Sequence, residues 1–252
     1  MFIKALCNKC GTVFYVDPWE QTTATCGKCG EKLDSVIAIN DFAMQPKSDD
    51  RNGCIIDKGI LTAYLGNSEK VAIPPGVSGI GNKAFSGSDI QSIVIPKGVS
   101  KISAETFAGC CYLKSVIMPD SVLRIENGAF SNCTSLQNII IPRSVAFIGS
   151  DAFLGCGIEN IDIPAGIEAI NIRCFSGCKS LRSIVIPEGV KSINEWAFSE
   201  CHFLKNIVIP NSVTSIAQYA FYGCSYVSRV IAPKRFYHDP AFGYIRDITI
   251  WE

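Results

Sequence analysis

Prolines, phenylalanines and cysteines recur along most of this 252-residue chain with one shared period of 22 or 23 residues. The prolines are Pro74, Pro96, Pro119, Pro142, Pro164, Pro187, Pro210 and Pro233. The phenylalanines are Phe85, Phe107, Phe130, Phe153, Phe175, Phe198 and Phe221, and the cysteines are Cys110, Cys133, Cys156, Cys178, Cys201 and Cys224. Three series locked to one period predict a solenoid, in which each repeat forms one unit and the units stack.

Each repeat is predicted to begin with a short strand and to return over the core. In residues 113–133, Val116 and Met118 alternate as in a strand, and Pro119, which lacks an N–H group, ends it. A small residue suited to a turn follows two positions later in most copies. Phe130 is then expected to fill the layer opposite the strand. A single repeat buries too little apolar surface to offset its lost chain entropy, so several repeats and two caps are required.

The two caps are predicted on either side of the repeats. Residues 59–64 and 70–73 flank the polar segment 65–69 and are interpreted as a hairpin that covers the first open edge. After Pro233 the pattern decays, and residues 245–251 are predicted to supply a final strand.

On these residues the segment 55–252 resembles the BspA-type leucine-rich repeat family. The shared motif is Leu-x-x-Ile-x-Ile-Pro-x-x-Val-x-x-Ile-x-x-x-Ala-Phe-x-x-Cys, and it covers about four-fifths of the chain. The resemblance implies a leucine-rich repeat solenoid with a parallel sheet along one face and irregular or short helical returns. It also implies protein binding, because family members are often surface-attached or secreted bacterial adhesins, or modules that bind host proteins.

A second module is predicted at residues 1–40, followed by a polar, turn-rich linker at 41–54. Cys7, Cys10, Cys26 and Cys29 form two C-x2-C pairs separated by fifteen residues, and each pair is followed by glycine. The segment resembles a zinc ribbon, and a structural Zn²⁺ would supply the folding energy that so short a segment lacks. An iron site of rubredoxin type, two disulfides and a redox-sensing thiol cluster remain the alternatives.

Two observations bear on the compartment. The N-terminus shows no apolar stretch of the secretory type, and no window approaches the ~18 apolar residues of a membrane helix. With thirteen cysteines, a zinc-knuckle pattern and no export signal, we expect a reducing cytoplasm. The alternative is a cell-surface or extracellular location.

The repeated cysteines are predicted to be packed thiols rather than disulfides. Stacked coils would bring neighbours of the series within bridging distance, but Ser88 in the equivalent position indicates that a small side chain is what this corner requires. Cys174 replaces an alanine and is expected to be packed as well. Cys54 and Cys111 fall outside the series and are expected to be exposed.

A candidate binding surface follows from strand alternation. The residue between the two core positions of each strand points outward. Down the stack this gives Ala72, Val94, Ile117, Ile140, Asp162, Val185, Val208 and Ile231. A contiguous exposed apolar stripe is typical of a protein-binding surface, and the alternative is an ordinary ladder of strand-favouring side chains. The predicted partner-binding residues are Val94, Ile117, Ile140, Asp162, Val185 and Val208.

Other functions have less support in the sequence. The 23 basic and 23 acidic residues sum to zero net charge, which disfavours nucleic-acid binding. His202 and His238 are the two histidines, and neither belongs to a recognisable catalytic set. We therefore predict a non-enzymatic protein-interaction module. A bacterial surface adhesin and a nucleic-acid-associated regulator led by the ribbon are the alternatives.

Overall fold

The chain divides into two compact units, Met1–Asp50 and Arg51–Glu252. The computed structural model describes three strands in the first unit, and residues 53–243, Ile245 and strand Thr249–Trp251 in the second. In the first unit, β1 (Ile3–Cys7) lies between β2 (Val13–Val16) and β3 (Val36–Ile39) and pairs antiparallel with both. Cys7 ends β1, whereas Cys10, Cys26 and Cys29 lie outside the described residues. The predicted zinc ribbon therefore stays a prediction.

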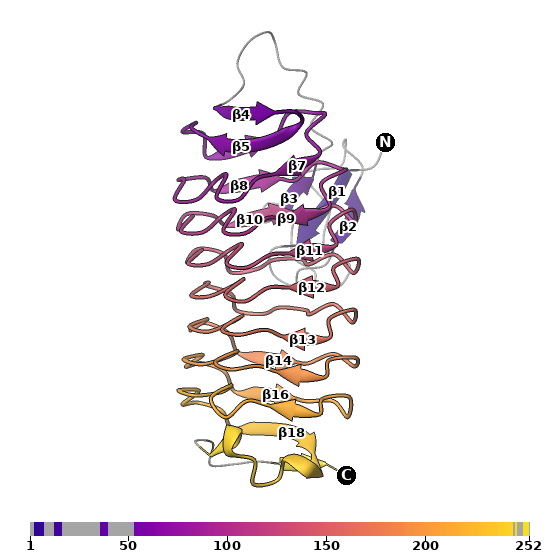
Figure 1. Ribbon diagram of the computed structural model, residues 1–252, viewed down its shortest axis with the longest axis vertical. Coiled ribbons are helices and arrows are strands. Elements are labelled where there is room, and N and C mark those ends of the chain that lie inside the picture. Colours follow the sequence, from indigo (N-terminus) through magenta and orange to yellow (C-terminus); the bar gives the residue numbers. More distant parts are fainter. Residues whose placement is uncertain are drawn as a thin grey trace. The chain divides into compact units, whose positions relative to one another are not determined.

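The second unit is a stack of coils, as the repeats predict (Figure 1). One parallel ladder is formed by the predicted strands that precede the prolines, and a C-terminal strand continues it. Its first part pairs β6 (Lys70–Ala72), β8 (Ser92–Val94) and β10 (Ser115–Ile117). Its second part pairs β14 (Ser183–Val185), β16 (Asn206–Val208), β18 (Arg229–Pro233) and β19 (Thr249–Trp251). Neighbouring strands pair in register, so equivalent residues of the repeats form columns.

A second row of two-residue strands lines the other side of the core, and we call this row the second ladder. Its members are β7 (Gly79–Ile80), β9 (Lys101–Ile102), β11 (Arg124–Ile125), β12 (Phe147–Ile148), β13 (Ala169–Ile170), β15 (Ser192–Ile193) and β17 (Ser215–Ile216). They are paired in three separate groups: β7 with β5 (Ile60–Tyr64), then β9, β11 and β12, then β13, β15 and β17. The second residue of these strands is buried in every coil up to β15 and half-buried in β17. The return over the core therefore contains a short strand, whereas the sequence prediction described the returns as irregular or short helical.

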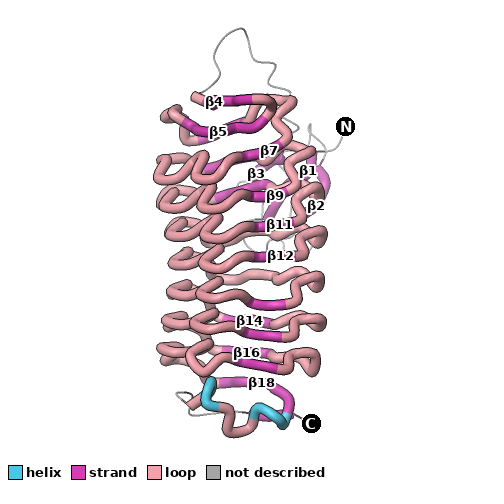
Figure 2. The backbone as a smooth tube through the Cα atoms, viewed as in Figure 1, coloured by secondary structure: helices cyan, strands magenta, loops and turns pink. Residues whose placement is uncertain are grey.

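The returns contain no helix between residues 53 and 233, so the short helical returns named as one possibility are not found there. The described helices are η2 (Lys234–Phe236) and η3 (Pro240–Phe242) in the C-terminal cap (Figure 2). Helices are absent from these returns because most of the returns contain two residues with the left-handed backbone conformation. In one coil these are Arg173 (φ 51°) and Gly177 (φ 68°), and a positive φ interrupts any run of right-handed helix.

The N-terminal cap is a hairpin, but it lies one element earlier than predicted. β4 (Cys54–Asp57) pairs antiparallel with β5 (Ile60–Tyr64) through a turn at Lys58 and Gly59, and both turn residues have positive φ. β5 then pairs with β7, and the segment 70–72 joins the first ladder as β6. This placement also buries Cys54, whose predicted exposure was wrong.

The phenylalanine series forms a continuous ring stack through the core. From Phe85 to Phe221, successive ring centroids lie 5.2 to 5.5 Å apart, and the planes are nearly parallel. Tyr64 extends the stack at one end and Phe242 at the other, so both caps take part in it. All seven series rings are buried. The predicted phenylalanine layer is confirmed.

The cysteine series runs beside the rings as buried free thiols, as predicted. Each Sγ donates to the carbonyl oxygen of the phenylalanine in the preceding coil, over 2.9 to 3.1 Å. Burial disfavours the thiolate and raises the pKa of Cys110 to about 11 and of Cys178 to about 12. Cys174 is buried and Cys111 is exposed, both as predicted. These cysteines link coils by packing and hydrogen bonds.

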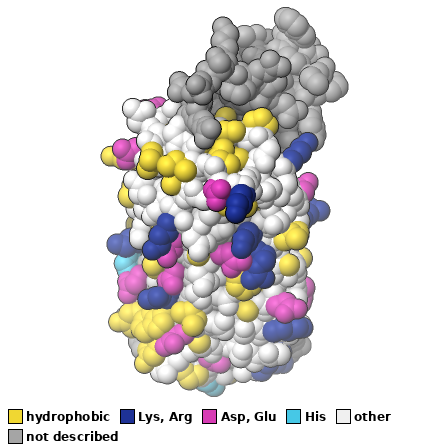
Figure 3. All heavy atoms as spheres, turned by 45° about the horizontal axis from the view of Figure 1, so that its top comes forward, with side chains coloured by type: hydrophobic (Ala, Val, Ile, Leu, Met, Phe, Trp, Pro, Cys, Tyr) yellow, Lys and Arg dark blue, Asp and Glu magenta, His cyan; other side chains and the backbone are white. Residues whose placement is uncertain are grey.

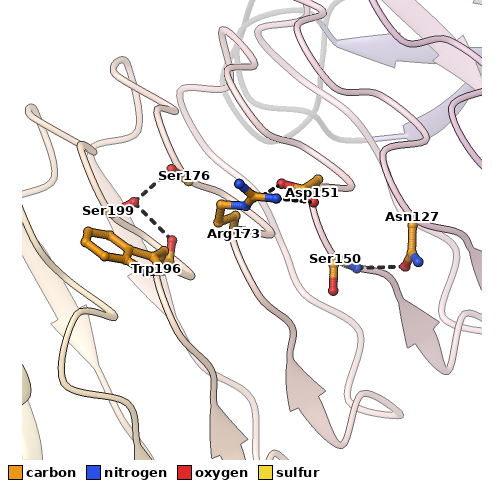
Figure 4. Close-up of polar contacts among 7 residues, drawn as sticks. All are labelled: Asn127, Ser150, Asp151, Arg173, Ser176, Trp196 and Ser199. Atoms are coloured by element: carbon orange, nitrogen blue, oxygen red, sulfur yellow. Dashed lines mark hydrogen bonds and ion pairs between the residues drawn. The ribbon is translucent and has the colours of Figure 1, made fainter.

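Polar side chains also join neighbouring coils at this corner (Figure 4). The Nε atom of Arg173 lies 2.9 Å from Oδ1 of Asp151, and the hydroxyls of Ser176 and Ser199 are 2.8 Å apart. Backbone hydrogen bonds also connect neighbouring coils here; for example, Phe153 N–H donates to the Cys174 carbonyl over 2.9 Å. The corner is therefore bonded from coil to coil.

Candidate functional site

The predicted stripe lies on the outer surface of the first ladder. Its residues alternate with core positions that are buried in every coil except at Met118, which is half-buried, so the stripe side chains face away from the core. Ile140 and Val185 are the most exposed of the apolar members, at 41% and 61%. Asp162 is also exposed, whereas Ala72, Val94, Ile117, Val208 and Ile231 are half-buried against their neighbours. Val94 pairs in register with Ile117, and Val185 with Val208, whereas Ile140 and Asp162 hold the same repeat position in the unpaired part of the face.

A polar column accompanies the stripe two residues earlier in each strand. It consists of Ser92, Ser115, Asn138, Asn160, Ser183 and Asn206, all at least partly exposed. The in-register pairs Ser92 with Ser115 and Ser183 with Asn206 place these side chains side by side. The face therefore offers hydrogen-bonding groups along one side of an apolar line.

The first ladder is interrupted at the middle of this face. Between β10 and β14 the pairing is reduced to one isolated bridge, Asn138 with Asn160. Asp162 occupies an outward strand position in this region, and aspartate is among the residues least suited to strands. The interruption also follows a shortened connection between the series cysteine and the next strand, from Cys156 to Ile158. The equivalent connection from Ser88 to Ile90 is shortened in the same way, but the strand after it, β8, is paired. Shortening alone therefore does not cause the interruption of the ladder.

An open depression of about 250 Å³ lies at the interruption. Its walls are Asn160, Ile161, Asp162, Ile163, Ser183, Val185 and Pro187. The depression therefore joins both columns of the face, because it includes the carboxylate, an amide, a hydroxyl and the most exposed valine of the stripe.

The two histidines lie away from this depression's lining and occupy different surroundings. His202 has Nδ1 3.0 Å from the Gly223 carbonyl and Nε2 3.4 Å from a carboxylate oxygen of Glu200. His238 packs its ring against Tyr237 at 4.2 Å beside a depression in the C-terminal cap. No hydrogen bond links either histidine to a serine or cysteine within the described part of the chain.

Sequence reasoning missed a group of aromatic side chains at the corner of the last coils. Trp196 stacks on Tyr219 with ring centroids 4.8 Å apart, and Phe203 stacks on Tyr226 at 5.7 Å. Figure 3 shows hydrophobic side chains gathered near the end of the stack. An alignment of the repeats could have revealed this group, because Trp196 is an aromatic residue at a repeat position where the upstream coils carry Asp151 or other small or charged residues.

Among the residues that the structure describes, no group of three or more His, Cys, Asp or Glu side chains is arranged to hold a metal ion. Within the same residues, no helix has the length and apolar character needed to cross a bilayer.

The coils, the paired ladder and the phenylalanine stack define a leucine-rich repeat solenoid protein. The chain belongs to the BspA type leucine rich repeat family, which matches residues 62–171 and 146–248 in six copies. A comparison with curated proteins gave no significant match.

Several solved structures are similar to this chain. A leucine-rich repeat protein from Bacteroides ovatus shares 26% identity with a TM-score of 0.49, covering 77% of this chain and 71% of that one. The T. pallidum leucine rich repeat protein shares 26% identity with a TM-score of 0.49, covering 75% and 89%. A leucine rich cell surface protein from Faecalibacterium prausnitzii shares 19% identity with a TM-score of 0.38, covering 92% and 94%.

Proposed function

We propose that this chain is a non-enzymatic protein-interaction module that binds its partner through the outer face of the first ladder. Leucine-rich repeat proteins generally act as protein-interaction modules. The observation that carries the proposal is the apolar stripe, with Val185 61% and Ile140 41% exposed on a surface that also has a depression. Exposed apolar residues in a contiguous row are typical of protein contact surfaces.

The rigidity of the stack favours this use. The stripe residues sit on backbone fixed by buried neighbours such as Ile184 and Ile207, so a partner meets a preformed surface. Preformed surfaces lose less conformational entropy on binding than flexible ones. The proposed contact residues are Val94, Ile117, Ile140, Asp162, Val185 and Val208.

Affinity capture followed by mass spectrometry tests this assignment. The full chain, the double variant Ile117→Glu with Ile140→Glu, and the control Leu123→Glu are used as baits in native lysate. Leu123 is 50% exposed but lies outside the stripe, so its variant reports the effect of any apolar-to-acidic surface change. We expect the stripe variant to lose partners that the control retains. Equal capture by all three folded baits would refute the binding face.

For the first unit, we propose that Cys7, Cys10, Cys26 and Cys29 bind one structural Zn²⁺. The C-x2-C spacing supports it, since tetrahedral thiolate sites of this type are typical of zinc. The antiparallel pairing of β1 and β2 also agrees, because Cys7 ends β1 and Cys10 falls in the connection to β2.

Elemental analysis of the native protein tests the zinc site. We expect about one zinc per chain, in line with four ligands per ion. The variant Cys26→Ser should lose the zinc, and the control Cys111→Ser should keep it. A native preparation that contains iron or no metal would overturn the assignment.

A further inference from the structure

One carboxylate stands alone in the two outward columns of the first ladder. Between residues 92 and 208 these columns carry serine, asparagine, valine and isoleucine, and Asp162 is their single charged residue. Its side chain is exposed and takes part in none of the ion pairs found among the described residues. The carboxylate therefore faces outward with its charge uncompensated.

Two charged side chains at the neighbouring edge of this face are paired with each other. Glu159 and Arg182 face one another across neighbouring coils, with 4.0 Å between the carboxylate oxygen and Nε. Such a pair contributes little net charge to the surface. Asp162 thus makes this part of the face locally acidic within an apolar stripe, which favours a partner group that is positively charged.

The depression beside Asp162 limits what that group can be. Its volume of about 250 Å³ is below the ~300 to 1,000 Å³ of pockets that hold small-molecule ligands, and it suits one long side chain. The amide of Asn160 and the hydroxyl of Ser183 add acceptors, whereas Val185 and Pro187 add apolar wall. A side chain that ends in a positively charged group with several hydrogen-bond donors would match the acceptors, and an aliphatic chain behind that group would match the apolar wall.

We propose that the depression receives an arginine side chain of the protein partner, with its guanidinium on Asp162. This inference rests on the proposed binding function of the face. A guanidinium presents planar, divergent donors that can bond a carboxylate and an amide oxygen together, which the compact ammonium of lysine does less well. The methylene stem of arginine packs on Val185 and Pro187.

A displayed library of random peptides, selected on the full chain, tests the inference without knowledge of the natural partner. The baits are the wild type, Asp162→Asn, Asp162→Arg and the control Asp120→Asn, whose carboxylate is exposed on the turn after Pro119. We expect wild-type peptides to be enriched in arginine beside apolar residues. Asp162→Arg should instead select acidic peptides.

Fluorescence anisotropy of one selected peptide then measures the pairing. Asp162→Asn should weaken binding about ten-fold or more, as expected for a hydrogen-bonded charge pair, and Asp120→Asn should not change it. Replacing the peptide arginine by uncharged citrulline should have a similar effect. The two changes together should cost little more than either one, because both remove the same contact.

The possible failures are distinguishable. Peptides that depend on Ile117 and Ile140 but lack arginine, or that bind Asp162→Asn unchanged, would overturn the arginine assignment and leave the binding face intact. If the chain binds the arginine form and a lysine-substituted form of a selected peptide equally well, the choice of a guanidinium is wrong. If no selected peptide is sensitive to Ile117→Glu with Ile140→Glu, the proposed function itself fails, and the arginine site with it.

Discussion

The central ring of the phenylalanine stack provides the sharpest test of how this solenoid is held together. Phe153 is completely buried, with Phe130 at 5.4 Å on one side and Phe175 at 5.5 Å on the other. The substitution Phe153→Ala removes the ring and both ring contacts at once. Its backbone links to the next coil, including the bond from Phe153 N–H to the Cys174 carbonyl, do not depend on the side chain.

The expected cost follows from burial and contacts. Replacing a buried phenylalanine by alanine costs about 3 to 5 kcal/mol, and the two ring contacts at roughly 0.5 to 1.5 kcal/mol each place Phe153 in the upper part of that range. The matched control is Phe203→Ala, which removes a ring that is 52% exposed and has one stacked partner, Tyr226. For this control we expect about 1 kcal/mol, because half of the surface is already in water.

Urea unfolding monitored by far-ultraviolet circular dichroism measures both variants, with zinc held constant. Because each coil contacts its neighbours alone, a central defect should also uncouple the two halves of the stack, so Phe153→Ala should broaden the transition as well as shift it. If Phe153→Ala costs no more than Phe203→Ala, the ring stack is not what couples the coils and the reasoning is wrong.

Three further predictions concern single positions. A Cβ on Gly157 would clash with the backbone carbonyl oxygen of Thr134, so Gly157→Ala should cost about 3 kcal/mol. A Cβ on Gly166 would meet ordinary van der Waals contacts, so Gly166→Ala should change the free energy of unfolding by less than about 0.5 kcal/mol, and thermal unfolding compares the two variants. Burial raises the pKa of Cys178 from 9.0 to about 12, so the folded chain keeps a proton that the unfolded chain releases. This thiol's stabilisation is intact below pH 9 and decreases by about 1.4 kcal/mol per unit as the pH rises toward 12. Burial raises the pKa of other thiols as well, Cys110 among them, so Cys178→Ser should make the fall of urea stability between pH 8 and 10 less steep without abolishing it. Cys111 is the exposed thiol among the described residues, so it should react with a thiol reagent well before the buried series does, and equal rates would contradict the packing.

The period of the sequence was enough to predict the stack, because it repeats the residues that decide burial. Phe130 and Cys133 recur with the proline, and stacking is the arrangement that buries the phenylalanine and cysteine series at once. The outward position of Ile140 and Val185 also followed from strand alternation. These features depend on local pattern, which a sequence contains directly.

Features that depend on pairing between coils were not predictable in this way. The turn at Lys58 and Gly59 joins residues 54–57 directly to β5, so these residues form the antiparallel hairpin with it. The strand β5 also pairs with β7, and residues 70–72 pair with β8 instead. The burial of Cys54 follows from this pairing. The second ladder was missed because two-residue strands such as β9 are too short to show alternation.

The interruption of the ladder beside Asp162 raises the question of why the stack tolerates it. Across the same coils the opposite corner continues without a break, since Phe130 N–H donates to the Ala152 carbonyl over 2.8 Å and Gly155 N–H to the Ser176 carbonyl over 2.8 Å. The buried rings also continue through this region at constant spacing. The corner bonds and the ring stack therefore hold neighbouring coils together where the sheet pairing is lost, so the outer face can carry a residue, such as an aspartate, that strands disfavour. For the same reason we expect variants at Asp162 and Ile140 to remain folded in the binding tests.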